Sequence, residues 1–229
     1  MGERMTRRGG VLAVAATAWV LLGCAPSGPP SSGSDATPDR PPASDPDDPD
    51  RTGGSFAAVG DSITDADSRN FAAGEIGPAS WAAYVVDAGV VFAGGWAEWG
   101  ATTSRMADAA AAVDADTLVV LAGTNDVAFG IPFAETSANL ERIVDAVGID
   151  DVVVSSIPPM DAYPQGPVEF NEQLEEFSDE RGWRFVDAAA DLRTSDGTFR
   201  SGMSFDGLHP SEDGARMLGE AIADELVAG

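Results

Sequence analysis

The sequence contains a serine, a histidine and an aspartate in short motifs, and these three residue types together can carry out acyl transfer. Ser62 follows Gly60 and Asp61, and His209, the one histidine of the chain, stands three residues after Asp206. A serine hydroxyl is a weak nucleophile that needs a base to take its proton, and imidazole suits this role because its ordinary pKa is near neutrality. A carboxylate beside an imidazole holds the needed tautomer. For residues 60–62 alone, the simpler interpretation is a strand-to-helix turn, because Gly, Asp and Ser favour turns and caps.

Such a site also needs hydrogen-bond donors for the oxyanion of the tetrahedral intermediate. The candidates are the backbone N–H groups of Ser62 and Gly100 and the side-chain amide of Asn125. Gly94 or Gly95 could take the place of Gly100, because the whole segment 94–100 is rich in glycine. Loss of one such donor typically slows catalysis by about 10²–10³-fold.

Ser62, Gly100 and Asn125 come after stretches that the sequence predicts to be buried strands, and Asp206 and His209 come directly before the last predicted helix. Apolar runs alternate with patterns of helical spacing, which predicts a parallel sheet with helices on both faces. The carboxyl ends of parallel strands share one edge, so residues that are distant in sequence can converge there. The long irregular segment 187–207, which carries Asp206, is expected to be functional. The predicted strands are 55–59, 90–93, 117–122, 151–156 and 183–186, and the predicted helices are 79–87, 103–113, 134–147, 168–181 and 211–227.

Four short motifs resemble, in the same order, the four sequence blocks of the SGNH (GDSL-type) hydrolase family. They are Gly60-Asp61-Ser62, Gly100, Gly123-Thr124-Asn125-Asp126 and Asp206-X-X-His209, and the resemblance spans residues 56–226. It implies a three-layer, flavodoxin-like α/β fold whose five-stranded parallel sheet has the order 2-1-3-4-5. It also implies Ser62 as nucleophile, His209 as base and Asp206 as the residue that orients it. Ser62, Gly100 and Asn125 would then form the oxyanion hole.

Composition excludes several other kinds of chemistry. The formal net charge is −25 and the chain has no lysine, so nucleic acid is not an expected partner and neither a phosphate-binding loop nor a Schiff base is expected. One cysteine excludes an internal disulfide, and one histidine excludes a multi-histidine metal site. No Gly-X-Ser-X-Gly elbow occurs, which argues against the ordinary α/β-hydrolase fold. We therefore expect no metal and no cofactor. The acidity is interpreted as an aid to solubility or an adaptation to a saline medium.

The N-terminal segment is predicted to direct export. A positively charged start precedes an apolar run at 11–22, which is too short for a membrane span and typical of a signal peptide. Its end, Leu21-Leu22-Gly23-Cys24, resembles the bacterial lipobox, which implies that Cys24 is lipidated after removal of residues 1–23. An ordinary signal peptide remains the alternative. Arg7-Arg8 loosely resembles a twin-arginine signal, and the sequence leaves open whether Met1 or Met5 is the true start.

Three parts of the chain are therefore expected: a lipoprotein-type signal peptide at 1–23, a tether at 24–54 and a hydrolase domain at 55–229. The tether is rich in Pro, Ser and Asp and has little to bury, so disorder is expected. The mature protein is expected to be a monomer on the extracellular face of the cell membrane or secreted. Its contact with the membrane would be through the N-terminal lipid alone.

The expected function is that of a serine esterase that hydrolyses short-chain acyl esters, acetyl above all, on a small molecule or a glycan. A lipase, lysophospholipase or thioesterase of the same fold is the alternative in the same class. A non-catalytic surface binding protein on a hydrolase fold is the alternative of another class. An intact set of Ser62, Asn125, Asp206 and His209 argues against the latter, because a binding module has no need of all four.

Large side chains near these motifs in sequence have two interpretations. They either shape a surface for the substrate or pack the loops onto the sheet. Nearby acidic residues are interpreted as solvated loop charges rather than calcium ligands, and nearby arginines as members of surface ion pairs. The large side chains are Trp96, Trp99, Phe129, Met203 and Phe205, the acidic residues are Asp65, Asp67 and Glu98, and the arginines are Arg69 and Arg105.

Overall fold

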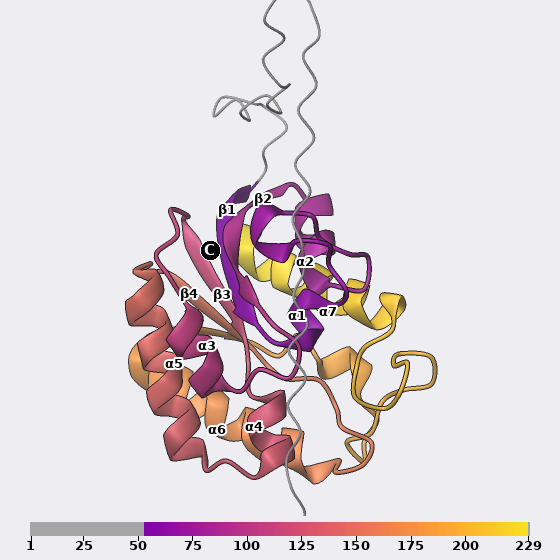
Figure 1. The fold of residues 1–229 in the computed structure, drawn as a ribbon. Helices are drawn as coiled ribbons and strands as arrows, with labels where there is room; N and C mark the ends of the chain where they lie inside the picture. The colour runs from indigo at the N-terminus through magenta and orange to yellow at the C-terminus, as the bar shows by residue number, and fades with distance from the viewer. Residues whose placement is uncertain (1–52, 229) are drawn as a thin grey trace, which may run out of the picture. The chain divides into compact units, whose positions relative to one another are not determined.

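The fold is that of a computed structural model, which describes residues 53–228 (Figure 1). The predicted signal peptide, Cys24 and the tether up to residue 52 lie outside the described residues. The described part begins in a strand at Gly53, two residues before the predicted start of the domain.

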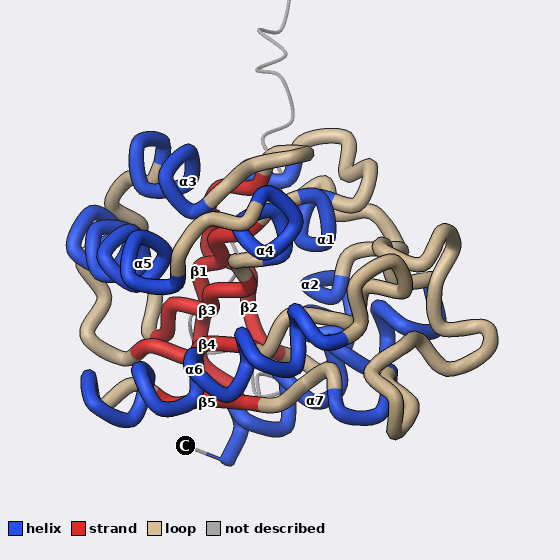
Figure 2. The backbone as a smooth tube through the Cα atoms, turned by 90° about the horizontal axis from the view of Figure 1, so that it is seen from below, coloured by secondary structure: helices blue, strands red, loops and turns tan. Residues whose placement is uncertain are grey.

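Five parallel strands form the central sheet, in the order β2-β1-β3-β4-β5 (Figures 1 and 2). This confirms the α/β class and the strand order 2-1-3-4-5. The inner strands β3 and β4 are buried along their whole length, as continuous Val and Leu runs are when helices cover both faces of a sheet. The strands are β1 Gly53–Gly60, β2 Val90–Ala97, β3 Thr117–Leu121, β4 Val152–Ser155 and β5 Arg184–Val186.

Helices cover both faces of this sheet. Helices α2 and α7 pack together on one face, and α3, α5 and α6 cover the other (Figures 1 and 2). The predicted helix 103–113 ends earlier, at Ala109. Two short helices directly after β1 and β3, α1 and α4, were not predicted. The helices are α1 Ser62–Asp65, α2 Trp81–Asp87, α3 Thr103–Ala109, α4 Thr124–Phe129, α5 Phe133–Val147, α6 Gln165–Arg181 and α7 Glu212–Ala228.

Strand β2 is longer than predicted, because Gly94 and Gly95 belong to it rather than to a loop. They pair with Ala57 and Ala58 of β1. Gly95 has a φ of +146°, and a Cβ atom there would lie 1.9 Å from the carbonyl oxygen of Ala58. Glycine at this position therefore permits a close approach of two backbones and does not mark a turn.

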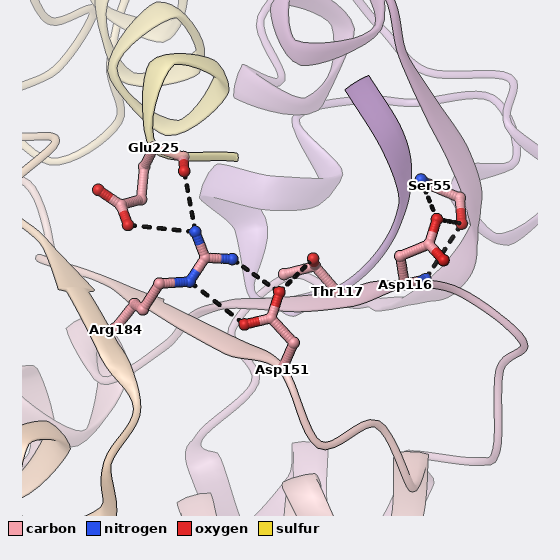
Figure 3. Close-up of polar contacts among 6 residues, drawn as sticks. All are labelled: Ser55, Asp116, Thr117, Asp151, Arg184 and Glu225. Atoms are coloured by element: carbon pink, nitrogen blue, oxygen red, sulfur yellow. Dashed lines mark hydrogen bonds and ion pairs between the residues drawn. The ribbon is translucent and has the colours of Figure 1, made fainter. Parts of the chain in front are cut away.

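The amino ends of the strands carry a polar cluster around Arg184 (Figure 3). Its guanidinium donates two hydrogen bonds to the Asp151 carboxylate, at 3.2 and 2.7 Å, and two to the carbonyl and carboxylate of Glu225, at 2.9 and 3.2 Å. Asp151 also accepts a 2.6 Å hydrogen bond from the hydroxyl of Thr117. The cluster joins the starts of β3, β4 and β5 to the end of α7.

Arg184→Leu should lower the free energy of unfolding by about 1–2 kcal/mol. The paired geometry makes these hydrogen bonds stronger than an isolated surface pair, while partial exposure weakens them. Arg216→Leu is the matched control, because Arg216 makes only exposed pairs within α7, and it should cost less than about 0.5 kcal/mol. Urea titration of both variants measures this difference. Equal losses would contradict the role of the cluster.

Candidate active site

Ser62 is the first residue of α1, directly after the turn that follows β1. The predicted strand-to-helix turn is therefore present, and it carries the candidate nucleophile. Gly60 makes the turn possible, because a Cβ atom there would lie 2.0 Å from the Thr64 hydroxyl oxygen. Asp61 caps the helix by accepting a 3.0 Å hydrogen bond from the backbone N–H of Ile63. The turn places Ser62 at the carboxyl edge of the sheet, the edge toward which Figure 2 looks.

The structure brings Ser62, His209 and Asp206 together. Ser62 Oγ lies 3.0 Å from His209 Nε2, and His209 Nδ1 lies 2.8 Å from Asp206 Oδ2. A carboxylate only accepts hydrogen bonds, so the imidazole proton belongs on Nδ1 and Nε2 is left to accept from the serine hydroxyl. The order of groups is that of a nucleophile, its base and the group that orients the base.

Asp206 is held as a carboxylate by its surroundings. Its Oδ1 accepts hydrogen bonds from the backbone N–H groups of Leu208 and His209, at 2.9 and 2.8 Å. Partial burial works in the opposite direction, but the hydrogen bonds from His209 and Leu208 lower the pKa of Asp206 to about 2. Asp206 therefore carries its negative charge at any pH near neutrality.

The loop that carries His209 is fixed by Ser204, a residue that the sequence did not single out. Its hydroxyl donates a 2.7 Å hydrogen bond to the carbonyl of His209 and accepts one of 2.8 Å from the backbone N–H of Gly207. Gly207 has a φ of +82°, a conformation that favours glycine. The predicted long loop 187–207 contains one short 3₁₀ turn, Ala190–Leu192, and is otherwise irregular as expected.

Asn125 lies in the first turn of α4, between the loop after β2 and the Ser62 turn. Its Nδ2 donates a 2.9 Å hydrogen bond to the carbonyl of Ala101 and lies 3.5 Å from Asp61 Oδ2. Gly100, the residue before Ala101, is exposed with a φ of +72°. Because Gly94 and Gly95 lie inside β2, Gly100 is the glycine that the structure places in the loop next to Asn125.

Asp126 ties this loop to the rest of the domain. It is buried and accepts hydrogen bonds from the backbone N–H and the hydroxyl of Thr103, at 3.0 and 3.2 Å. The Thr103 hydroxyl in turn accepts a 3.2 Å hydrogen bond from Asn139 of α5. Burial raises the pKa of Asp126, and the hydrogen bonds from Thr103 oppose this. These contacts hold the start of α3, and with it the Gly100 loop, against α4.

Asp61 is a second buried carboxyl group, and the sequence did not reveal its burial. It has no exposed surface, and its burial raises its pKa to about 7, against the lowering effect of the Ile63 N–H and of His209. Asp126 is close enough to add to the rise. The position of this aspartate just after the apolar run 56–59 is the signal that could have pointed to its burial.

A small pocket of about 60 Å³ opens beside Ser62 and His209. Trp99 and Phe205 line it, as one of the two interpretations of these side chains predicts. The other three large residues do not: Trp96 lies under the Arg105 guanidinium at 5.2 Å, Met203 packs against the core and Phe129 is 70% exposed on α4. The remaining lining residues are Ile63, Ala66, Asp67, Ala79 and Pro210.

Two larger cavities lie elsewhere and contain none of the candidate catalytic residues. One, of about 150 Å³, lies between α6 and the segment after β5, and the other, of about 260 Å³, is an apolar space beside β2. Within residues 53–228, no cluster of three or more His, Cys, Asp or Glu side chains is arranged to hold a metal ion. No helix among these residues is long and apolar enough to cross a membrane.

Charged residues near the site are mostly in ion pairs. Arg105 donates hydrogen bonds of 3.0 and 2.8 Å to Glu98, and Arg69 lies 3.9 Å from Glu75. The pairing of both arginines is as predicted. Asp65 is not a free loop charge, however, because it accepts a 2.8 Å hydrogen bond from the indole N–H of Trp99.

The fold and this arrangement of residues agree with the comparison of the chain with protein families. Residues 58–217 match the GDSL-like Lipase/Acylhydrolase family. The chain belongs to this family of ester-hydrolysing enzymes, also called SGNH hydrolases. No curated protein matches the chain significantly.

Solved structures share the fold at low sequence identity. A protein of the lipolytic G-D-S-L family from Veillonella parvula has 19% identity and a TM-score of 0.58, over 74% of this chain and 96% of its own. A catalytic mutant of Axe2, an acetylxylan esterase from Geobacillus stearothermophilus, has 20% identity and a TM-score of 0.59, over 76% of this chain and 94% of its own. A GDSL-like lipase from Bacteroides thetaiotaomicron has 18% identity and a TM-score of 0.55, over 75% and 87%.

Proposed function

We propose that this acylhydrolase is a serine esterase that removes short acyl groups, acetyl above all, from a carbohydrate, with Ser62 as its nucleophile. One observation carries the proposal: Ser62, His209 and Asp206 form a chain of hydrogen bonds, and a small, mostly apolar pocket lies beside Ser62 and His209. The two atoms that exchange the proton, Ser62 Oγ and His209 Nε2, already lie at hydrogen-bond distance, which is the geometric requirement for general-base catalysis.

In the proposed mechanism, Ser62 Oγ attacks the ester carbonyl while its proton passes to His209 Nε2. The ionised Asp206 stabilises the resulting imidazolium through Nδ1. The tetrahedral intermediate collapses, the alcohol leaves with the proton from His209, and an acyl-serine remains. Water then attacks this acyl-enzyme with His209 again acting as base. The products are the carboxylic acid and free Ser62.

The size of the pocket supports a short acyl group. A volume of about 60 Å³ holds only a few atoms, because a single water molecule already needs about 10–15 Å³. An acetyl group fits inside such a space, whereas a long fatty acyl chain would extend out of it into solvent. The distant likeness in fold to an acetylxylan esterase makes an acetylated glycan the first substrate to test.

A panel of substrates tests this proposal. p-Nitrophenyl acetate, butyrate, octanoate and laurate measure the chain-length preference, and acetylated xylan, with release of acetate as the readout, measures action on a glycan. We expect kcat/KM to be highest for acetate and to fall at octanoate. Faster hydrolysis of octanoate or of a phospholipid would overturn the short-chain assignment in favour of a lipase or lysophospholipase.

Asn125→Ala should lower kcat by about 10²–10³-fold with little change in KM, because an oxyanion donor acts mainly in the transition state. The proposal gives this role to the side chain of Asn125, together with the backbone N–H groups of Ser62 and Gly100. Steady-state kinetics on p-nitrophenyl acetate measures the effect. An unchanged kcat in a variant with wild-type thermal stability would remove Asn125 from the oxyanion hole.

We also propose that the enzyme is exported and held at the extracellular face of the membrane by a lipid on Cys24, as a monomer. The lipobox-like Leu21–Cys24 and the apolar run before it support this. Cys24→Ser should move the protein from the membrane fraction to the soluble fraction. Unchanged fractionation would refute lipid anchoring.

A further inference from the structure

Trp99 lies directly against the candidate catalytic base. The centres of its ring system and of the His209 imidazole are 4.9 Å apart, and the two planes are inclined by 34°. Trp99 belongs to the loop between β2 and α3, so it reaches His209 from a distant part of the chain. Its side chain is nevertheless 50% exposed, so the indole is not part of the core.

A hydrogen bond holds the indole in this position. Its N–H donates to Asp65 Oδ2 at 2.8 Å. Asp65 is the last residue of α1, the helix that begins with Ser62. The candidate nucleophile and the residue that holds Trp99 are therefore fixed to each other by one helical turn.

The same indole forms one wall of the pocket beside Ser62 and His209, in which the acyl group is proposed to bind. Ala66 and Asp67, which follow Asp65, also line the pocket and have φ angles of +43° and +57°. Residues other than glycine rarely adopt this left-handed conformation, and for alanine it is strained. The end of α1 thus keeps an unfavourable conformation where it borders the pocket and holds the indole.

We propose that Trp99, held by Asp65, limits the length of the acyl group and positions the ring of His209. This inference rests on the proposed esterase function and deepens it. As a wall, the indole fills the space into which a longer acyl chain would extend. As a neighbour of the imidazole, it restricts rotation of that ring away from Ser62 and Asp206. Trp99 is therefore a specificity-determining and positioning residue, and it takes no part in bond making.

Three variants separate these roles. Trp99→Ala removes the wall and the contact with His209, Trp99→Phe keeps a ring but cannot bond to Asp65, and Asp65→Asn weakens the attachment. Each is measured for kcat and KM on p-nitrophenyl acetate, butyrate and octanoate. Phe129→Ala is the matched control, because Phe129 is an exposed aromatic residue outside the pocket.

We expect Trp99→Ala to raise the ratio of kcat/KM for octanoate to that for acetate by about tenfold or more, since one methylene group accommodated in an apolar pocket changes kcat/KM by about tenfold or more. Its kcat on acetate should fall by about tenfold with KM nearly unchanged. The reason is that a less well positioned His209 stabilises the transition state less, while substrate binding does not depend on its position. Trp99→Phe and Asp65→Asn should give smaller changes in the same directions. Phe129→Ala should change neither quantity.

If folded Trp99→Ala has an unchanged ratio of kcat/KM for octanoate to that for acetate, Trp99 does not limit the length of the acyl group. If its kcat on acetate is unchanged, Trp99 does not position His209. The half-exposed position of Trp99 favours correct folding of the variants, and thermal unfolding checks it. Failure of the esterase proposal has a different signature, because the wild-type protein would then show no hydrolysis that depends on Ser62. A wild-type preference for octanoate would refute the short-chain assignment yet leave the ratio test of Trp99 intact.

Discussion

Ser62→Ala should lower kcat/KM for p-nitrophenyl acetate by about 10⁴-fold or more. The variant keeps the pocket and the oxyanion donors but has no nucleophile, and loss of any member of a serine triad removes most of its rate enhancement. His209 would then activate only water, which is not fixed at the position of the serine oxygen. The retained pocket and oxyanion donors should leave a residual rate that is small but still about 10³-fold or more above that of the free ester in the same buffer.

A fluorophosphonate probe gives an independent measure of the same prediction. The wild-type protein should be labelled on Ser62, and Ser62→Ala should not be labelled. Ser137→Ala is the matched control, because Ser137 lies on α5 and its hydroxyl only bonds to the carbonyl of Ala134. Equal hydrolysis by the wild-type and Ser62→Ala proteins would refute the nucleophile assignment.

Asp61→Asn should make the protein more stable at pH 8, by about 2–4 kcal/mol, with an advantage that shrinks toward pH 4. Burial raises the pKa of Asp61 from 3.8 to about 7 in the folded state. Between these values the folded protein keeps a proton that the unfolded chain releases, so a rise in pH destabilises the wild-type fold by about 1.4 kcal/mol per pH unit. Asparagine is neutral throughout and removes this dependence.

Urea titrations of both proteins at pH 4.5, 6 and 8 measure this effect as a difference between variant and wild type. The comparison cancels the contributions of the other acidic groups. Asp114→Asn, at an exposed aspartate, is the surface control. A stability difference between Asp61→Asn and wild type that stays constant with pH would show that burial does not raise the pKa of Asp61 in the folded protein.

Much of the fold follows from local patterns in the sequence. Continuous valine and leucine at 117–121 predict a central strand because such residues must be covered on both sides. The prediction that Gly94 and Gly95 lie in a loop was wrong. Glycine locally favours a turn, but here it allows β2 to lie close to the backbone of the neighbouring strand β1. Helices α1 and α4 are too short to show a helical period.

The part of the candidate site that depends only on the order of strands and helices could be predicted from the sequence. Parallel strands bring Ser62 and Asn125 to one edge, and the motif before the last helix adds Asp206 and His209. The contact of Trp99 with His209 was not predictable, because it depends on the path of an irregular loop. The complete burial of Asp61 also depends on packing from several elements at once.

Strand β1 has a consequence for how this enzyme can be attached to a surface. The strand begins at Gly53 and ends at Gly60, next to Ser62, so at about 3.3 Å per residue its two ends are roughly 25 Å apart. Anything joined directly before Gly53 enters the domain at the edge of the sheet that carries the Arg184 cluster, and the pocket beside Ser62 opens at the opposite edge. A fusion partner or a bead attached directly before Gly53 would therefore lie at the edge of the sheet opposite to the pocket beside Ser62.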